Sequence, residues 1–202
     1  MRKAIKILIG SSLFYNLSAG LLGPLWALYV QNIGGGVEGA TTAWAVWAFF
    51  VGILTLLFGR VEDKLNKRIM FVLGRFLDFI GVTGYIFVQS IFQLYLIQGI
   101  LGASLAIMNP SFNAIYSKSL DKGRESTEWS YWQGSIYIII SMAALAGGAI
   151  VTFFGFTTLF VAMSISSFIS LMVALMFMRK KIKNEILLIE GKSIRRGKKL
   201  KK

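Results

Sequence analysis

Six long apolar stretches constrain the fold of this chain more than any other feature of its sequence. They cover residues 5–31, 40–58, 69–88, 92–115, 129–153 and 156–178. A helix needs about 20 apolar residues to cross a hydrocarbon core of about 30 Å. Backbone inside that core must satisfy its own hydrogen bonds, and the strands of membrane barrels are only about ten residues long. The sequence therefore predicts an all-α membrane protein with six transmembrane helices.

The composition excludes several classes of chemistry. Hydrophobic residues make up 55% of the chain and charged residues 15%, whereas an average soluble domain carries about 25% charged residues. The chain has no Cys and no His, so disulfides, thiolate chemistry and the usual zinc or haem ligands are missing. Catalysis by a Ser-His-Asp or Cys-His arrangement is excluded for the same reason. We expect no enzyme, no cofactor and no metal site.

The 22 Lys and Arg residues fall into four clusters, which predict the orientation of the helices. The clusters lie at residues 2–6, 60–75, 118–124 and 179–202, and the connections near 34–39, 89–91 and 154–155 hold none. Short loops rich in Lys and Arg stay in the cytoplasm. This alternation predicts that both termini are cytoplasmic and that the protein is a multi-pass protein of the cell membrane. The net charge of +13 thus indicates orientation, and we expect no nucleic acid as partner.

The two ends of the chain carry separate expectations. Met1-Arg2-Lys3 precedes an apolar run that is longer than the roughly 7–15 apolar residues of a signal peptide, so we expect a retained helix. We divide the chain into a transmembrane domain, residues 1–180, and a basic cytoplasmic tail, residues 181–202. The tail is either solvated or in contact with anionic lipid headgroups.

The loop after the second stretch carries a recognisable motif. It reads Gly59-Arg60-Val61-Glu62-Asp63-Lys64-Leu65-Asn66-Lys67-Arg68 and resembles the G-x-L-x-D-R/K-x-G-R-K/R motif of the major facilitator superfamily (MFS), which lies in the same loop. We expect Gly59 to allow a close backbone approach and Asp63 to meet a helix N terminus. Asn66 stands where the family has Gly, and Asn tolerates the left-handed turn that Gly would supply. The resemblance implies a conformational latch made of Gly59, Asp63, Lys64, Asn66, Lys67 and Arg68.

The resemblance extends over residues 5–180, the N-terminal six-helix half of a typical twelve-helix member. Residues 98–103 and 147–160 also resemble MFS segments. Two departures weaken an inference of proton antiport: Tyr95 replaces an Arg, and Ala143-Ala144 replace Gly-Pro. The two halves of the MFS fold are parallel repeats, so the resemblance implies a homodimer of this chain or a partnership with a separate second half.

Polar and small residues form one-sided stripes on three of the predicted helices. At helical spacing, these stripes consist of Asn16, Gly20 and Pro24; Tyr95, Gln98, Asn109 and Asn113; and Gln133, Tyr137 and Ser141. Such faces avoid lipid. They line either a substrate cavity, which the resemblance also implies, or interhelical hydrogen bonds. Among the aromatic residues, Tyr15 and Trp47 lie deep in their stretches, whereas Trp26 and Trp44 lie near helix ends and are expected in an interfacial belt.

Asp78 is the one acidic residue well inside an apolar stretch. The resemblance places this helix at the periphery of the bundle. Asp78 either couples transport to protons together with Arg75, or forms a structural ion pair with Arg75, whose side chain would reach the cytoplasmic interface.

The predicted cavity stripes contain no charged side chain, which favours a small neutral or lipophilic substrate. We therefore predict a half-size secondary transporter, efflux-like and acting as a homodimer. Uptake or facilitated movement of a neutral, sugar-like solute is the alternative within transport. A non-transporting membrane scaffold, or one half of a split transporter, is the alternative from another class.

Overall fold

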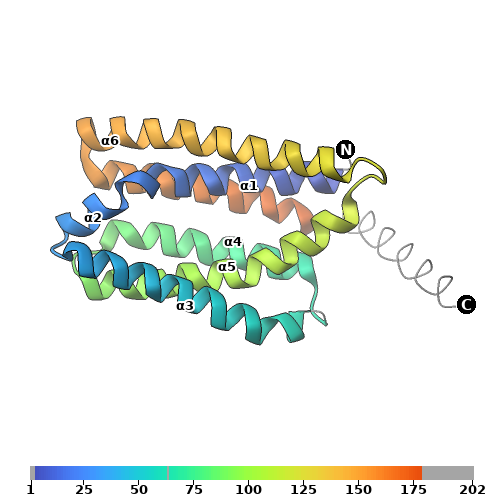
Figure 1. Ribbon diagram of the computed structural model, residues 1–202, viewed down its shortest axis with the longest axis horizontal. Coiled ribbons are helices and arrows are strands. Elements are labelled where there is room, and N and C mark those ends of the chain that lie inside the picture. The colour runs from blue at the N-terminus through green and yellow to red at the C-terminus, as the bar shows by residue number, and fades with distance from the viewer. Residues whose placement is uncertain (1–2, 63, 179–202) are drawn as a thin grey trace, which may run out of the picture.

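The computed structural model describes residues 3–62 and 64–178 of the chain, and the described part is helical without strands (Figure 1). Its elements are α1 (Lys3–Leu22), η1 (Gly23–Leu25), α2 (Trp26–Asn32), α3 (Gly36–Glu62), α4 (Lys67–Gly84), η2 (Tyr85–Phe87), α5 (Ile91–Ser119), α6 (Glu125–Leu175) and η3 (Met176–Met178). Within these two ranges, five helical runs are long and apolar enough to cross a membrane by length and composition. The predicted basic tail and Asp63 lie outside the described residues.

Two residues interrupt the long apolar runs. Pro24 stands at the start of η1, where its missing N–H and fixed φ end the α-helix, so the first run continues as α2. Gly155 lies inside α6 with φ 79° and ψ 176°, a conformation that only glycine adopts readily. Figure 1 shows α6 doubling back, so that residues 125–154 and 156–175 form two arms. These arms correspond to the fifth and sixth predicted helices, although the run Glu125–Met178 counts as one candidate span.

Small residues bring the helices of the bundle into close contact. On α1, Ser11 Oγ donates to the Ser170 carbonyl at 3.0 Å and Ser18 Oγ donates to the Met163 carbonyl at 3.1 Å. Both acceptors lie in the second arm of α6. Where aliphatic side chains gain nothing by leaving lipid, such small residues and hydroxyl groups hold helices together.

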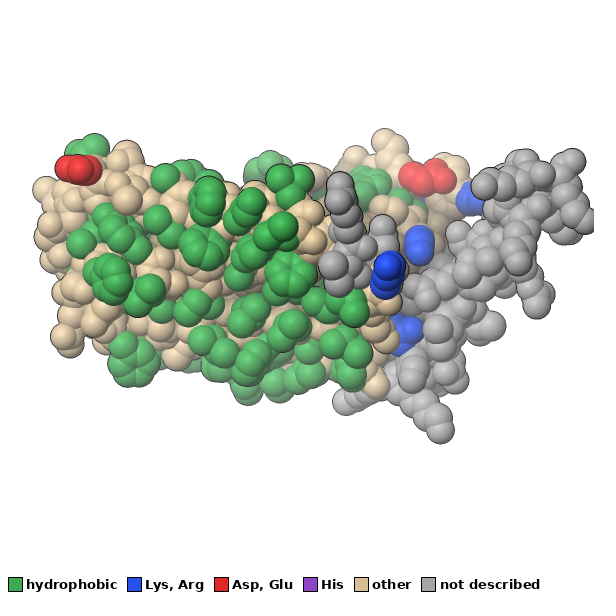
Figure 2. Space-filling model, turned by 90° about the horizontal axis from the view of Figure 1, so that it is seen from below, with side chains coloured by type: hydrophobic (Ala, Val, Ile, Leu, Met, Phe, Trp, Pro, Cys, Tyr) green, Lys and Arg blue, Asp and Glu red, His purple; other side chains and the backbone are tan. Residues whose placement is uncertain are grey.

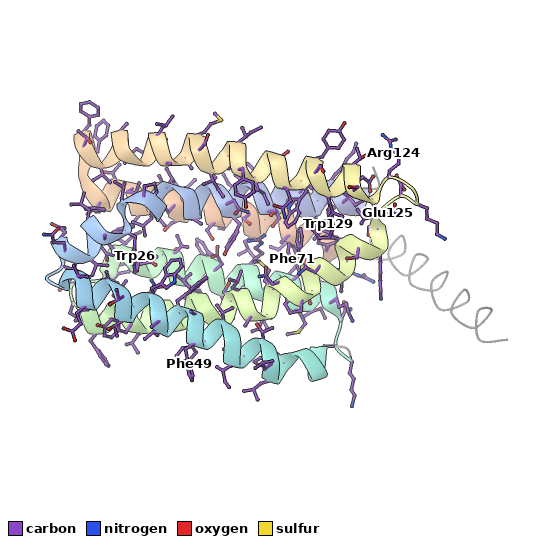
Figure 3. All side chains as sticks on the ribbon, viewed as in Figure 1. Trp26, Phe49, Phe71, Arg124, Glu125 and Trp129 are labelled. Carbon is purple, nitrogen blue, oxygen red and sulfur yellow. The ribbon has the colours of Figure 1, made fainter. Side chains whose placement is uncertain are left out.

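The apolar side chains form two clusters along the bundle. One cluster includes Phe71, Phe112 and Phe177, with Trp129 packed against it, and the other includes Tyr85 and Phe160, with Trp26 packed against it. Figure 3 places Trp26 and Trp129 toward opposite ends of the bundle.

The helix α3 differs from the others in its exposure. Only 6% of its most apolar window is buried, compared with 44–50% for the other candidate spans. Figure 2 shows a face of the molecule on which apolar side chains form a broad band, with charged side chains toward the two ends. This distribution matches a bundle surrounded by hydrocarbon with charged ends in water.

Candidate functional site

Two cavities, each of about 270 Å³, open on either side of Tyr15 and share its side chain as a wall. We name them the aromatic cavity and the polar cavity. The aromatic cavity is lined by Tyr15, Ser18, Ala19, Leu22, Gly23, Trp26, Trp44, Trp47, Asp78, Val82, Tyr85, Gln98, Leu101 and Met163. The polar cavity is lined by Ser12, Tyr15, Asn16, Arg75, Met108, Asn109, Phe112, Asn113, Trp132 and Ile136.

Three tryptophans from two segments give the aromatic cavity its character. Trp44 and Trp47 project from α3 one turn apart, with ring centroids 4.9 Å from each other. Trp26 begins α2 directly after the break at Pro24, and its indole Nε1 is buried without a hydrogen-bond partner among the described residues. Aromatic walls with a free donor suit a flat, lipophilic ligand that carries one acceptor group.

Asp78 contributes a carboxyl group to the aromatic cavity. Its side chain is 4% exposed, and its Oδ2 accepts a hydrogen bond from Ser167 Oγ at 2.5 Å. Ser167 lies in the second arm of α6, so this contact ties α4 to that arm. The stripes predicted a cavity without charge, and this prediction was wrong, because an acid from α4 reaches the wall.

Arg75 lies one turn before Asp78 on α4 and lines the polar cavity. Its Cζ lies 4.3 Å from the ring centroid of Tyr15 and 5.2 Å from that of Phe71. Among the described residues, Arg75 Nε and Nη1 have no hydrogen-bond partner. The side chain is 1% exposed, so it does not extend to the interface.

Arg75 and Asp78 attract each other through their charges, but each side chain also contacts a different helix. Asp78 turns to Ser167 of α6, whereas Arg75 turns to Tyr15 of α1. Positions three apart share a helix face only approximately, and each side chain therefore finds a different neighbour. As a result, one cavity has an acid in its wall and the other has a base.

The polar cavity combines amides and hydroxyls with an apolar floor. Asn16 Nδ2 donates to the Ser12 carbonyl at 2.8 Å, and Trp132 Nε1 donates to Ser12 Oγ at 3.3 Å. Asn109 and Asn113 of α5 complete the polar part of the wall, and both are exposed. The ring of Phe112 lies 5.0 Å from that of Trp132, so these two residues form an aromatic floor.

The structure brings some of the predicted stripe residues to the cavities and places others elsewhere. Gln98 lines the aromatic cavity, and Asn16, Asn109 and Asn113 line the polar cavity. The remaining stripe residues line neither of these two cavities: Gly20, Pro24, Tyr95, Gln133, Tyr137 and Ser141.

The reasons differ from helix to helix. Gly20 is buried against the first arm of α6, where a Cβ would lie 2.9 Å from that of Ala143. Tyr95 packs against the core cluster that contains Tyr85. On α6 the residues that face the polar cavity are Trp132 and Ile136, so the predicted stripe was wrong by about 100° of helix rotation.

The loop motif also differs from its prediction in two details. Asn66 has φ −74° and ψ 103°, and its side chain accepts a hydrogen bond from the Arg68 backbone N–H at 3.1 Å. It is therefore an N-cap of α4, and no left-handed turn forms at this position. A Cβ at Gly59 would meet no other atom within 4 Å, so the expected close approach is not formed in the described chain.

The charges of the motif are divided between surface and interior. Lys64 is exposed, Lys67 is partly exposed, and Arg68 is buried at 6% exposure. Asp63 lies outside the described residues, so its predicted contact with a helix N terminus stays a prediction.

Sequence reasoning missed part of the aromatic cavity. Trp26 and Trp44 were expected in an interfacial belt because they lie near helix ends, but both line the cavity. The i, i+3 spacing of Trp44 and Trp47 on one helix was the available signal. Tyr85 and Met163 carried no comparable signal, because their contribution depends on how α4 and α6 pack.

Comparisons with known proteins agree with this architecture. The model of the family described as Major Facilitator Superfamily matches residues 8–200. The chain is 22% identical over 156 residues to the uncharacterized MFS-type transporter YitZ of Bacillus subtilis (strain 168), which covers 76% of this chain and 93% of YitZ. It is 25% identical over 159 residues to the multi-drug resistance efflux pump PmrA of Streptococcus pneumoniae, which covers 77% of this chain and 40% of PmrA.

A solved structure shows the same fold. The POT family transporter PepTSo superposes with a TM-score of 0.70 at 12% identity, covering 88% of this chain and 37% of that one. The chain thus spans less than half the length of PmrA and PepTSo and nearly all of YitZ. With a family model matched over most of its length and this fold, the chain belongs to the Major Facilitator Superfamily.

Proposed function

We propose that this protein is a half-size secondary transporter that exports small lipophilic compounds by alternating access. The aromatic cavity carries the proposal. It presents three tryptophans, a free indole N–H and the amide of Gln98 at the junction of α1, α3, α4 and α5. Ligand sites of this kind combine apolar walls with a few polar groups that orient the ligand. The efflux direction is supported by the similarity to PmrA, whose name describes a multidrug efflux pump.

Asp78 extends this proposal toward substrates with a positive charge. A carboxylate beside the faces of Trp and Tyr rings attracts an organic cation through both charge and the ring quadrupole. We propose that the aromatic cavity takes lipophilic solutes that are neutral or carry a single positive charge. The same carboxyl is the proposed proton-coupling group, with Arg75 one turn away. Asp78→Asn should abolish flux driven by a pH gradient, and unchanged flux would exclude coupling through this residue.

We further propose that both arms of α6 cross the bilayer, giving six spans with both termini in the cytoplasm of a cell-membrane protein. Each arm is about 20 residues or longer, which is enough to cross the hydrocarbon core. The clustering of Lys and Arg in alternate connections supports the orientation. Attaching a cysteine-reactive label to a cysteine introduced at Phe154, an exposed residue beside the turn at Gly155, tests this: labelling from the outside of intact cells supports it, and protection contradicts it.

The working unit in this proposal is a homodimer. Among the described residues, the low burial of α3 leaves an apolar helix without a protein neighbour on most of its surface, and the match to YitZ covers 93% of that relative. Parallel halves of the MFS fold are related by an axis along the membrane normal, and two copies of one chain can adopt this symmetry. A species at twice 22.4 kDa in native mass spectrometry is expected. A strict monomer would point to a separate second half.

Export of the dye ethidium, an aromatic cation, tests the function. Cells lacking their own drug pumps are loaded with ethidium, and expression of the chain should accelerate loss of fluorescence. Gln98→Leu should slow this loss, because it removes the cavity amide. Gln133→Leu is the matched control, since Gln133 is exposed and lines neither cavity. A folded chain that never exceeds the empty-vector rate would favour the scaffold alternative.

A further inference from the structure

We propose that the polar cavity is a second binding site, specific for a small organic carboxylate that Arg75 recognises. This ligand class goes beyond the lipophilic solutes proposed for the aromatic cavity, and it differs from them in charge. The proposal rests on three observations: a buried guanidinium with free donors, a polar rim, and an apolar floor beside it.

Arg75 is a buried cation whose donors are available. Two of its three guanidinium nitrogens, Nε and Nη1, have no hydrogen-bond partner among the described residues, although the side chain is 1% exposed. The charge of Asp78, one turn away, attracts that of Arg75, but a buried charge is costly unless it is also hydrogen-bonded. The stacking of Arg75 on Tyr15 at 4.3 Å holds the guanidinium plane in place but satisfies no N–H group. The planar donor fork matches a carboxylate, which it can bind through two parallel hydrogen bonds.

The surrounding side chains define the rest of the ligand. Asn109 and Asn113 at the rim offer amide groups to a polar substituent or to the carboxylate itself. Phe112 and Trp132, with rings 5.0 Å apart, form an apolar surface on which an aromatic or branched aliphatic group can lie. The volume of about 270 Å³ is just below the range of roughly 300–1,000 Å³ that is typical of drug-sized ligands. The site therefore fits a small carboxylic acid with one compact apolar group.

A second copy of the chain is a poor alternative source of this carboxylate. Of the nine acidic residues, Asp78 alone lies inside an apolar stretch. Asp78 is itself buried and accepts from Ser167, so it is not free to reach the Arg75 of another copy. The other acids lie along the sequence in connections, near helix ends or in the tail. A small anion that enters from the open side of the cavity is neither held by another hydrogen bond nor fixed at a distant position of the chain.

Binding of sodium benzoate to the purified full chain in lipid nanodiscs tests this proposal. Isothermal titration calorimetry compares benzoate with benzamide, which has the same ring and no charge, and with acetate, which has the charge and no ring. We expect saturable binding of benzoate, weaker binding of acetate, and no binding of benzamide. Equal heats for benzoate and benzamide, or no binding of either anion, would overturn the proposal. Because no transport is measured, the result is independent of the ethidium assay.

Variants assign the binding to Arg75. Arg75→Gln should weaken benzoate binding by roughly 10- to 100-fold, the effect of losing a charged hydrogen-bonding partner. Arg68→Gln is the matched control: Arg68 is also buried and lies on the same helix, but it lines neither cavity. Unchanged affinity in Arg75→Gln would refute the assignment. If Arg75→Gln does not fold, Arg75→Lys keeps the charge and loses the fork, and should still bind benzoate more weakly than the native chain. Full affinity in Arg75→Lys would refute bidentate recognition.

Discussion

The interface between α1 and α6, which we call the seam, and the outer surface of α3 differ in how their side chains are satisfied in a bilayer. Along the seam, serine hydroxyls reach backbone carbonyls of the neighbouring helix, as at Ser11 and Ser18. On α3, large apolar side chains such as Leu56 and Phe49, 76% and 66% exposed, point away from the bundle; Figure 3 shows Phe49 projecting outward. At the polar end of α3, the Thr41 hydroxyl donates to the carbonyls of Val37 and Glu38 of the same helix.

This difference indicates which interactions hold the helices of the bundle together. Lipid is as apolar as a leucine side chain, so burying leucine against protein gains little. Close packing of small residues and interhelical hydrogen bonds do stabilise the folded bundle, and these contacts are concentrated at the seam. The helix α3 is held instead by its contact with α5, where Gly102 lies so close to Trp47 that a Cβ would come within 2.8 Å of the Trp47 carbonyl oxygen. Its outer face remains available for lipid or for a second half.

Gly147→Leu should break the seam and have the largest effect. A Cβ at Gly147 would overlap the backbone carbonyl of Leu21 on α1, and backbone cannot move aside as a flexible side chain can. We expect a loss of several kcal/mol in unfolding free energy, in the upper range for overpacked core sites. The measurement is unfolding in detergent followed by tryptophan fluorescence. Gly148→Leu is the control, because nothing lies within 4 Å of a Cβ there; equal losses would contradict close packing at the seam.

A double-mutant cycle at Ser11 and Ser170 should reveal a smaller coupling. The Oγ atoms of Ser11 and Ser170 lie 3.1 Å apart. Ser11 Oγ also donates to the Ser170 carbonyl at 3.0 Å, and Ser170 Oγ donates to the Ser11 carbonyl at 2.7 Å. Reciprocal bonds of this kind in membranes are worth about 0.6 kcal/mol on average, with a maximum of about 1.7 kcal/mol. Unfolding of Ser11→Ala, Ser170→Ala and the double variant supplies the coupling energy. Strictly additive effects would mean that the contact between the two hydroxyl groups contributes nothing to stability.

Leu56→Ala on the outer face of α3 should have the smallest effect on the stability of the single chain. The side chain is 76% exposed, so its removal creates no cavity, and we expect a change within about 0.5 kcal/mol. Native mass spectrometry of the same variant sharpens the comparison. A lower dimer fraction at unchanged monomer stability would assign this face to the proposed interface. A marked loss of monomer stability would show that this face of α3 packs against other parts of the same chain.

Much of the architecture followed from hydropathy and charge. The long apolar runs, the break near residue 155 and the all-helical class agree with the structure, and the family resemblance is confirmed. Membership of a transporter family also confirms that the chain is not an enzyme and that it is a multi-pass membrane protein. These properties depend on local composition and on the length of a helix that crosses a bilayer, both of which can be read along the chain.

The residues that line the cavities were harder to predict from the sequence. Helical spacing located Gln98 and Asn109, but it chose Gln133 in place of Trp132, because an amphipathic stripe is weak on a helix whose outer side is also apolar. The spacing of Arg75 and Asp78 on one helix left two interpretations open, a structural ion pair and a proton-coupling site. Their actual partners, Tyr15 and Ser167, are 60 and 89 positions away along the chain.

The sequence by itself determined that this chain crosses a membrane, which runs are helical, and to which superfamily it belongs. Those properties follow from hydrophobicity, from the obligatory pairing of backbone groups in hydrocarbon, and from a local motif. The tertiary structure alone decided that an acid lines one cavity and a base lines the other. That outcome depends on how α1 and the second arm of α6 pack against α4, since a buried polar group turns toward whichever neighbouring helix offers it a partner.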